Sequence, residues 1–279
     1  MPVNKSFCSI AYKFRPETGI LDIIREVKAA GYDGVEVWWA HVEKMSDARL
    51  AEVKAAAAAA RLAMPMLSPY LGNFNLAMTN HDEMIDRTKA AAPVAVKLGI
   101  PLLRAFVGWT CECSSLTASE EYWRFNLKGF REMAAIAADH GLTIAMETHG
   151  QTLADSVQGV RRLLDEADGR LRVNFQLDDM AVNSKLPDGV AVYEAVKPWV
   201  VHMHVPLSAQ GTGNVAEFQR IFAAMRRDGF QGFASIEYCS GKGEPREAVK
   251  AGVRMLAGCL CSVAAMPERG QLCPRGGSY

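Results

Sequence analysis

The chain alternates short apolar runs with longer amphipathic runs, and this alternation repeats eight times. The apolar runs are residues 6–11, 34–39, 63–68, 101–107, 142–147, 172–178, 200–205 and 233–238. Strict alternation of strands and helices with short connections is typical of a parallel sheet, and eight units of roughly 30 residues indicate a closed barrel. The sequence therefore predicts an α/β protein with a single (β/α)8 TIM barrel.

The segments between the apolar runs have helical periodicity, and several end at a glycine that can adopt the left-handed conformation of a helix stop. The predicted helices are residues 20–31, 47–61, 81–98, 119–140, 153–167, 188–197, 214–228 and 244–260. An open doubly wound sheet is the alternative, but no Gly-x-Gly-x-x-Gly opens the first helix. We expect the barrel to span residues 1–258, and residues 259–279, rich in Pro and Gly, to form a C-terminal tail.

Composition excludes several classes of protein. A chain of 279 residues with 49% hydrophobic residues can bury one large core. Its 31 basic and 31 acidic residues balance, without a basic cluster for nucleic acid. We find neither a membrane-spanning run nor a signal peptide, and the seven cysteines lack the paired spacing of a zinc or disulfide framework. We expect a cytoplasmic protein with reduced thiols and without a membrane or nucleic-acid partner. The sequence is compatible with a homo-oligomer.

Polar side chains end the last four predicted strands, namely Glu147, Asp178, His204 and Glu237. Successive members lie 31, 26 and 33 residues apart, which matches the strand–helix repeat. Because the carboxyl ends of barrel strands converge on one mouth, all four should reach the same rim. Three carboxylates and an imidazole suit a divalent cation that prefers oxygen, with Mn²⁺ favoured and Mg²⁺ or Co²⁺ as alternatives.

The sequence leaves open which residue of the sixth strand is the metal ligand. Alternation in residues 172–178 turns Asn174, Gln176 and Asp178 toward the interior, because side chains two apart share a face. This pattern favours Asp178 over Asp179 as the ligand, with Asp179 and Gln176 as the alternatives.

The same alternation identifies further inward residues that could contact a substrate. Candidates are Glu36 and Trp38 on the second strand, Tyr70 on the third, Arg104 on the fourth and His202 on the seventh. His202 lies one layer deeper than His204, so we expect it to be hydrogen-bonded in the core. An aromatic wall with one fixed cation fits a small polar substrate.

The motifs GYDGVEVW, METHGQTLADS, LDD, KPWVVHMH and GFASIEY resemble the xylose-isomerase-like TIM barrel superfamily of sugar isomerases and epimerases over about residues 6–258. Relatives include ketose 3-epimerases, inosose isomerase and dehydratase, and dehydroshikimate dehydratase. Residue by residue, the resemblance implies metal ligands at Glu147, Asp178, His204 and Glu237. Ala181 stands where many relatives carry His or Asn. Val205 and Pro206 follow His204 where many carry His-x-Lys, so a substrate contact made by that Lys is absent here.

The resemblance implies a metal-dependent enzyme that removes a proton next to a carbonyl of a keto-sugar or cyclic keto-polyol. In an isomerase or epimerase, Glu147 and Glu237 would exchange the protons. In the alternative, a lyase similar to dehydroshikimate dehydratase or one that eliminates from a 3-oxo-glycoside, His149 would be the base. An abasic-site endonuclease shares the barrel, but it needs more histidine ligands and a basic groove. A non-catalytic barrel would lack one of the ligands.

Overall fold

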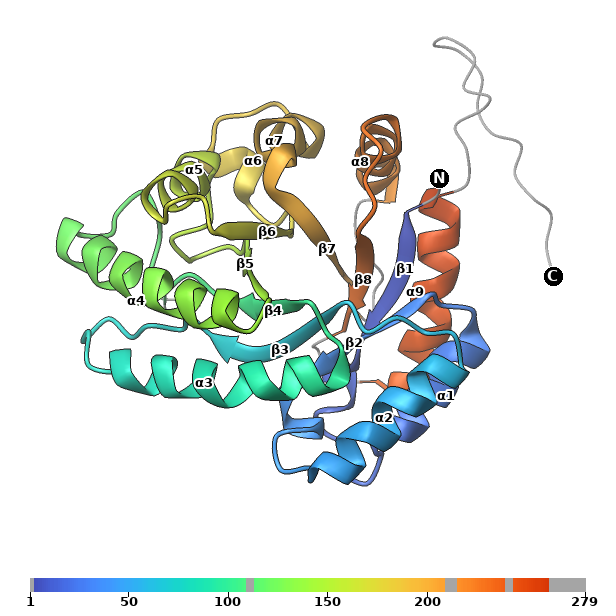
Figure 1. Ribbon diagram of the computed structural model, residues 1–279. Coiled ribbons are helices and arrows are strands. Elements are labelled where there is room, and N and C mark those ends of the chain that lie inside the picture. Colours follow the sequence, from blue (N-terminus) through green and yellow to red (C-terminus); the bar gives the residue numbers. More distant parts are fainter. Residues whose placement is uncertain (1–2, 109–112, 209–214, 239–242, 261–279) are drawn as a thin grey trace, which may run out of the picture.

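The computed structural model describes residues 3–108, 113–208, 215–238 and 243–260. Eight parallel strands close into a barrel in the order of the sequence, and β8 pairs with β1 (Figure 1). The strands are β1 (Asn4–Cys8), β2 (Gly34–Trp38), β3 (Met66–Leu71), β4 (Leu102–Ala105), β5 (Thr143–Glu147), β6 (Leu171–Phe175), β7 (Val200–Pro206) and β8 (Phe233–Glu237). The predicted (β/α)8 barrel is confirmed.

Helices follow the strands and surround the barrel (Figure 1). They are α1 (Ile20–Ala30), α2 (Asp47–Ala59), α3 (His81–Leu98), α4 (Glu120–Asp139), α5 (Val157–Glu166), α6 (Met180–Asn183), α7 (Gly189–Val196), α8 (Val215–Arg227) and α9 (Pro245–Leu260). Gly31 and Gly99 end α1 and α3 in the left-handed conformation, as predicted. Among the helices of the described ranges, none is long and apolar enough to span a membrane.

Two sets of side chains alternate along each strand. Those facing the helices, such as Val35 and Val37, are fully buried in the main hydrophobic core. Those facing the barrel interior include Glu36 and His204, which are buried as well. Because helices cover the outer face and side chains fill the interior, both faces of each strand are dry, as is usual for parallel sheets. The charged interior residues must therefore find partners among themselves.

Several predicted strand boundaries are wrong at their ends. The first strand ends at Cys8 and continues as the short 3₁₀ helix η1 (Ser9–Tyr12), and the third runs over Met66–Leu71 rather than 63–68. The sixth ends at Phe175, and Asp178 lies in the turn that follows, with a φ of 32°. A positive φ ends the extended backbone on which alternation depends, so the strand pattern does not determine the direction of the Asp178 side chain.

The predicted tail begins within the last helix. Helix α9 continues through Leu260, so Cys259 and Leu260 are helical, and residues 261–279 lie outside the described ranges. The cysteines that the structure describes, Cys8, Cys113 and Cys259, are not in disulfide bonds. The other four, at positions 111, 239, 261 and 273, lie outside the described ranges.

A test of the barrel mouth concerns Gly72, which follows β3 with a φ of +69°. An added Cβ would lie 2.2 Å from the carbonyl oxygen of Phe106 and would clash with it. Gly31 provides the control, because it has a φ of +92° but no atom within 4 Å of the point where a Cβ would lie. We expect Gly72→Ala to lower the free energy of unfolding by about 1–3 kcal/mol more than Gly31→Ala does. Urea unfolding of both variants measures this difference, and equal losses would contradict the steric argument.

Candidate metal centre at the barrel mouth

The carboxyl ends of β5, β7 and β8 bring three of the predicted ligands together. Nδ1 of His204 lies 3.0 Å from Oε1 of Glu147 and 3.6 Å from Oε1 of Glu237. One ligand atom from each of the three residues lies within 4.8 Å of the others. Glu147 and His204 are fully buried, and Glu237 is 9% exposed. The three side chains can therefore direct their donor atoms at one small ion.

Arg104, from β4, bridges the two glutamates. Its Nε donates to Oε2 of Glu147, and its Nη2 lies 2.9 Å from Oε1 of Glu237. The guanidinium also stacks 4.7 Å above the ring of Phe106. Arg104 thus offsets the repulsion between the two carboxylates, and Oε1 of Glu147 remains directed at His204.

Glu36, from β2, lies beneath the cluster. Its Oε2 is 2.9 Å from Nε2 of His204 and 3.2 Å from Nε2 of His202, and Ser68 and Cys8 donate to its Oε1. Glu36 is fully buried and its contacts are internal. The sequence indicated that Glu36 faces inward, but its partners on β1, β3 and β7 could be found only from the folded barrel.

The charges of the cluster depend on one another. Burial by itself lowers the pKa of His204, but Glu36, Glu237 and Glu147 outweigh this effect and raise it to about 10. Burial raises the pKa of Glu36, whereas His204 and His202 together hold it well below its usual range. Both ring nitrogens of His204 therefore carry protons when no other cation is present. An ion at Nδ1 would replace one proton, while Nε2–H would still donate to Glu36.

The donor set fits a divalent cation. Two carboxylates and one imidazole converge, and the carboxylate of Glu36 holds the opposite ring nitrogen of the imidazole, as is common behind metal-binding histidines. Buried polar atoms without a hydrogen-bond partner among the described residues also lie on β6 and just after it, namely both amide atoms of Asn174 and Oε1 of Gln176. These residues could hold an ion of the kind that the sequence predicts.

His149 lies just beyond the end of β5, at the edge of the mouth. Its side chain is 27% exposed, and its Nδ1 lies 2.7 Å from the carbonyl oxygen of Gly150. Phe106 contacts the imidazole edge-on at 5.7 Å and stacks with Tyr70 at 5.8 Å. Donation from Nδ1 to the carbonyl leaves the lone pair of a neutral ring on Nε2.

Asp178 lies apart from the three-ligand cluster. Its Oδ2 accepts hydrogen bonds from the backbone N–H of Gly150 and from Nε2 of Gln176, each at 3.0 Å. The same oxygen is 3.8 Å from Nδ1 of His149. The groups of His, Cys, Asp and Glu that could hold an ion in the described ranges do not include Asp178 or Asp179.

Two further residues predicted to contact a substrate, His202 and Trp38, lie in different surroundings. His202 is fully buried and hydrogen-bonded to Glu36 and Ser235, as expected for a core histidine. Trp38 is partly buried and contacts His41 edge-on, and its indole N–H has no partner in the described part of the chain. Alternation on β8 indicates that Ser235 faces inward, but sequence reasoning missed its contact with His202. It also missed Cys8, which inner-face alternation on β1 could have indicated.

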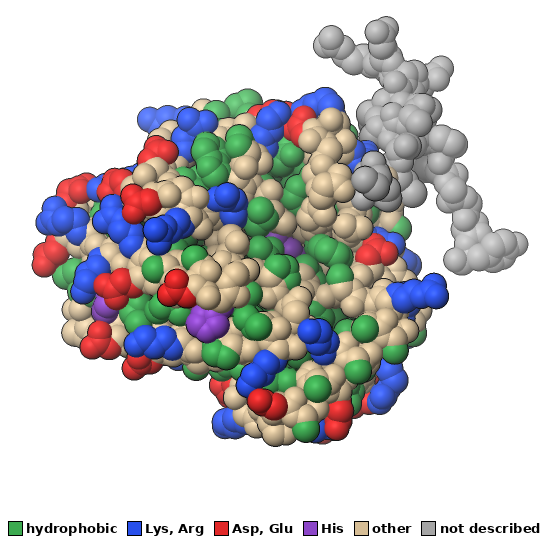
Figure 2. Space-filling view, in the orientation of Figure 1, with side chains coloured by type: hydrophobic (Ala, Val, Ile, Leu, Met, Phe, Trp, Pro, Cys, Tyr) green, Lys and Arg blue, Asp and Glu red, His purple; other side chains and the backbone are tan. Residues whose placement is uncertain are grey.

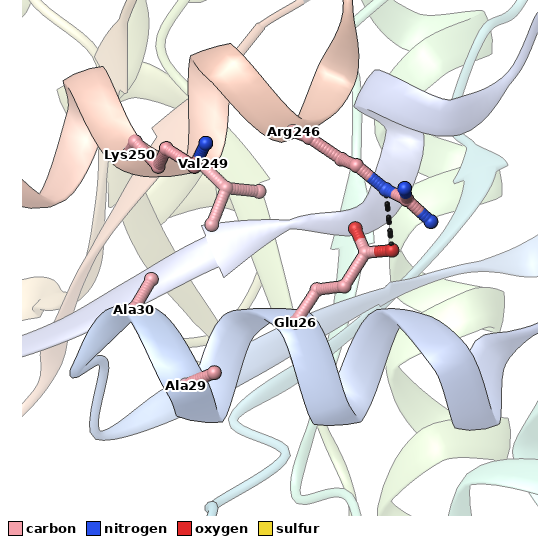
Figure 3. A pocket seen from close by; sticks show the side chains of 6 residues that line it. All are labelled: Glu26, Ala29, Ala30, Arg246, Val249 and Lys250. Carbon is pink, nitrogen blue, oxygen red and sulfur yellow. Dashed lines mark hydrogen bonds and ion pairs between the residues drawn. The ribbon is translucent and has the colours of Figure 1, made fainter.

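A separate surface pocket lies between α1 and α9 and is lined by Glu26, Ala29, Ala30, Arg246, Val249 and Lys250 (Figure 3). Its volume is about 250 Å³, and Arg246 donates to Glu26 at 2.8 Å. None of the strand-end residues lines this pocket. The proposed ligands at the barrel mouth are therefore separate from this pocket.

The fold and the cluster define a (β/α)8 barrel with carboxylate and imidazole groups at its carboxyl mouth. Residues 24–259 match the family model described as xylose isomerase-like TIM barrel. The chain belongs to this family.

Related proteins are enzymes by name. A 3-dehydroshikimate dehydratase of Bacillus anthracis is 24% identical over 224 residues, which cover 78% of this chain and 77% of that protein. The structure of the probable 3-DHS dehydratase AsbF from Bacillus anthracis has a TM-score of 0.76 at 21% identity, over 91% of this chain and 98% of that one. The structure of 3-keto-D-glucoside 4-epimerase from E. coli has a TM-score of 0.72 at 18% identity, and the match covers 92% of this chain and 99% of that one.

A further similar structure contains a metal. It is a xylose isomerase-like TIM barrel protein from Mycobacterium smegmatis in complex with magnesium, with a TM-score of 0.65 at 14% identity over 92% of this chain and 98% of that one. Similarity at these identities establishes the fold, and the chemistry of this chain depends on its own residues.

Proposed function

We propose that the protein is a divalent-metal-dependent isomerase or epimerase that removes a proton next to the carbonyl of a small keto-sugar or keto-polyol. One observation carries this proposal: Glu147, His204 and Glu237 direct donor atoms within 4.8 Å of one another at the barrel mouth. Active sites of (β/α)8 barrels lie at this end of the strands.

Glu147, His204 and Glu237 would hold the ion, together with a fourth ligand from the segment after β6, for which the sequence favours Asp178. Mn²⁺ is the predicted ion, and Mg²⁺ or Co²⁺ also suit the donor set. When bound, the ion supplies Lewis-acid polarisation of the substrate carbonyl. Glu36 keeps the His204 ring oriented from behind through Nε2.

Proton transfer falls to Glu147 and Glu237 in an isomerase or epimerase. Each has one oxygen near Nδ1 of His204 and also contacts Arg104. Arg104, with Trp38 and Tyr70, would position the polar substrate against the stacked rings at the mouth. Glu36 and His202, named by the sequence as substrate contacts, are better suited to support from below, because Glu36 is bonded to Nε2 of His204, and His202 is bonded to Glu36 and Ser235.

A lyase is the second candidate, and the position of His149 favours it. The ring lies beside the mouth with Nδ1 directed at a backbone carbonyl, which leaves Nε2 suited to accept a carbon-bound proton. Asp178, 3.8 Å from Nδ1, would stabilise the protonated ring. The 24% identity to a 3-dehydroshikimate dehydratase supports the same reaction class.

An abasic-site endonuclease has less support. On the face shown in Figure 2, basic and acidic side chains are interspersed around the edge, and the centre is mainly hydrophobic or uncharged. This face lacks the stripe of basic side chains that would bind the phosphate backbone of DNA. A cytoplasmic location and a homo-oligomeric state remain predictions from the sequence.

We expect one divalent ion per chain, held by Glu147, His204 and Glu237, because the second group of possible ligands, Glu36, His202 and His204, shares His204 with the first. EDTA should abolish activity, and Mn²⁺ or Co²⁺ should restore it. Elemental analysis before and after treatment, with a screen of keto-sugars, dehydroshikimate and 3-oxo-glycosides, measures both expectations. Full activity in a metal-free sample would refute the proposed function.

A further inference from the structure

A cavity of about 390 Å³ lies at the end of the barrel opposite the candidate metal centre. The residues that line it are at the start of β4, β7 and β8 or directly precede β3, β4 and β8. In a closed barrel of eight strands in sequence order, β3 and β4 lie across the axis from β7 and β8. The cavity therefore crosses the amino-terminal opening of the barrel, whereas the proposed metal ligands are at the carboxyl ends of the strands.

The walls of this cavity are mainly apolar and partly aromatic. Leu102, Phe230 and Phe233 are among its lining residues, and no Asp, Glu, Lys or Arg of the described ranges lines it. Both rings pack against glycine backbone, because a Cβ on Gly34 would lie 2.9 Å from the ring of Phe233 and one on Gly232 would lie 2.4 Å from that of Phe230. The rings are thus held in place, and the cavity suits a neutral molecule.

His202 contributes a polar group to the wall of the cavity. The residue is fully buried, and its Nε2 lies 3.2 Å from Oε2 of Glu36 and 2.9 Å from Oγ of Ser235. Its Nδ1 is buried and has no hydrogen-bond partner among the described residues. The other described residues with such atoms, including Asn174 and Gln176, do not line the cavity. His202 therefore combines an unpartnered buried atom with a place on the cavity wall.

The contacts of the imidazole determine what kind of partner Nδ1 needs. Burial lowers the pKa of His202, so the ring is neutral and carries one proton. Because a carboxylate only accepts hydrogen bonds, the proton lies on Nε2, which faces Glu36, and Nδ1 has the lone pair. A buried acceptor without a donor is uncommon and indicates a missing partner. A molecule that satisfies Nδ1 must therefore bring an O–H or N–H group.

We propose that the amino-terminal opening of the barrel binds a small phenol, whose ring packs against Leu102, Phe230 and Phe233 and whose hydroxyl donates to Nδ1 of His202. A volume of about 390 Å³ and apolar walls with few polar groups are typical of small-molecule sites. A carboxylate or phosphate would find no cation among the described lining residues. A sugar would bury several hydroxyls without partners, which is unfavourable. This inference is independent of the proposed function.

The test titrates the full chain with 4-fluorophenol and follows binding by ¹⁹F nuclear magnetic resonance. We expect a dissociation constant on the order of 1 mM or lower for a probe of this size. The matched probe 4-fluoroanisole carries a methyl group in place of the hydroxyl proton, so it should bind about tenfold more weakly or worse. The ¹⁵N resonance of Nδ1 in His202 should shift with 4-fluorophenol and stay unchanged with 4-fluoroanisole.

Leu102→Trp should weaken binding of 4-fluorophenol more than about tenfold, because the larger ring fills part of a site in which the probe must be enclosed. Leu116→Trp is the control, since Leu116 is 59% exposed and does not line the cavity, and it should bind as the wild type does. Circular dichroism verifies folding, and the two probes decide on the wild type alone if Leu102→Trp does not fold. Absence of binding, equal affinity for both probes, or a shift at His149 instead of His202 would overturn the inference.

Discussion

His149→Ala is expected to keep one divalent ion per chain and to lose about 10²–10⁴ in turnover if the reaction is an elimination, which is the usual contribution of one positioned base. The imidazole lies outside the three-ligand cluster, so its removal leaves Glu147, His204 and Glu237 in place. Elemental analysis and steady-state kinetics on the substrate found by screening measure the two expectations.

Deuterium exchange distinguishes this reaction from epimerisation. In an epimerase that uses two glutamates, His149→Ala should mainly weaken substrate binding, while Glu147→Gln and Glu237→Gln abolish exchange of the carbon-bound proton. Each variant is incubated with substrate in deuterated water, and metal content, exchange and product are compared. Exchange at the wild-type rate in His149→Ala would exclude this residue as the base and would favour the epimerase.

Arg104→Met is expected to lower the free energy of unfolding of the metal-free protein by about 3–5 kcal/mol, the usual cost of removing one partner of a buried ion pair. The side chains of Arg104 and Glu147 are 4% and 0% exposed, so water cannot replace the guanidinium. Both Glu147 and Glu237 would lose their cation together. Urea unfolding in EDTA measures the loss.

The same variant should respond more strongly to metal than the wild type does. A divalent cation would restore positive charge between the two carboxylates, so Mn²⁺ should raise the free energy of unfolding more in Arg104→Met. Lys97→Met is the control, because its ion pair with Asp47 is exposed and should contribute about 0–1 kcal/mol. Equal small losses in both variants would show that Arg104 does not compensate the buried charges.

Much of the fold can be predicted because its signals are local. Helical periodicity, glycine stops and apolar runs are each contained in a short window, and the predicted helix over residues 81–98 matches α3 (His81–Leu98) at both boundaries. The predicted sixth strand extends three residues past the end of β6, since the pattern of residues 172–178 continues to alternate after β6 ends at Phe175. A periodicity of two describes which residues could share a face, but it does not detect a positive φ.

The sequence is sufficient to predict the barrel and the inward positions of Glu147, His204 and Glu237. The regular spacing of the strand ends can be recognised without knowing which distant residues are in contact. The pairing of these groups, in contrast, follows from the folded barrel. Glu36 meets His204 across 168 positions of the chain, and Arg104 meets Glu147 across 43. These pairs depend on the register of closed strands and on the exclusion of water from the interior. Burial makes every charge there require a partner, and barrel closure selects which residues are within reach.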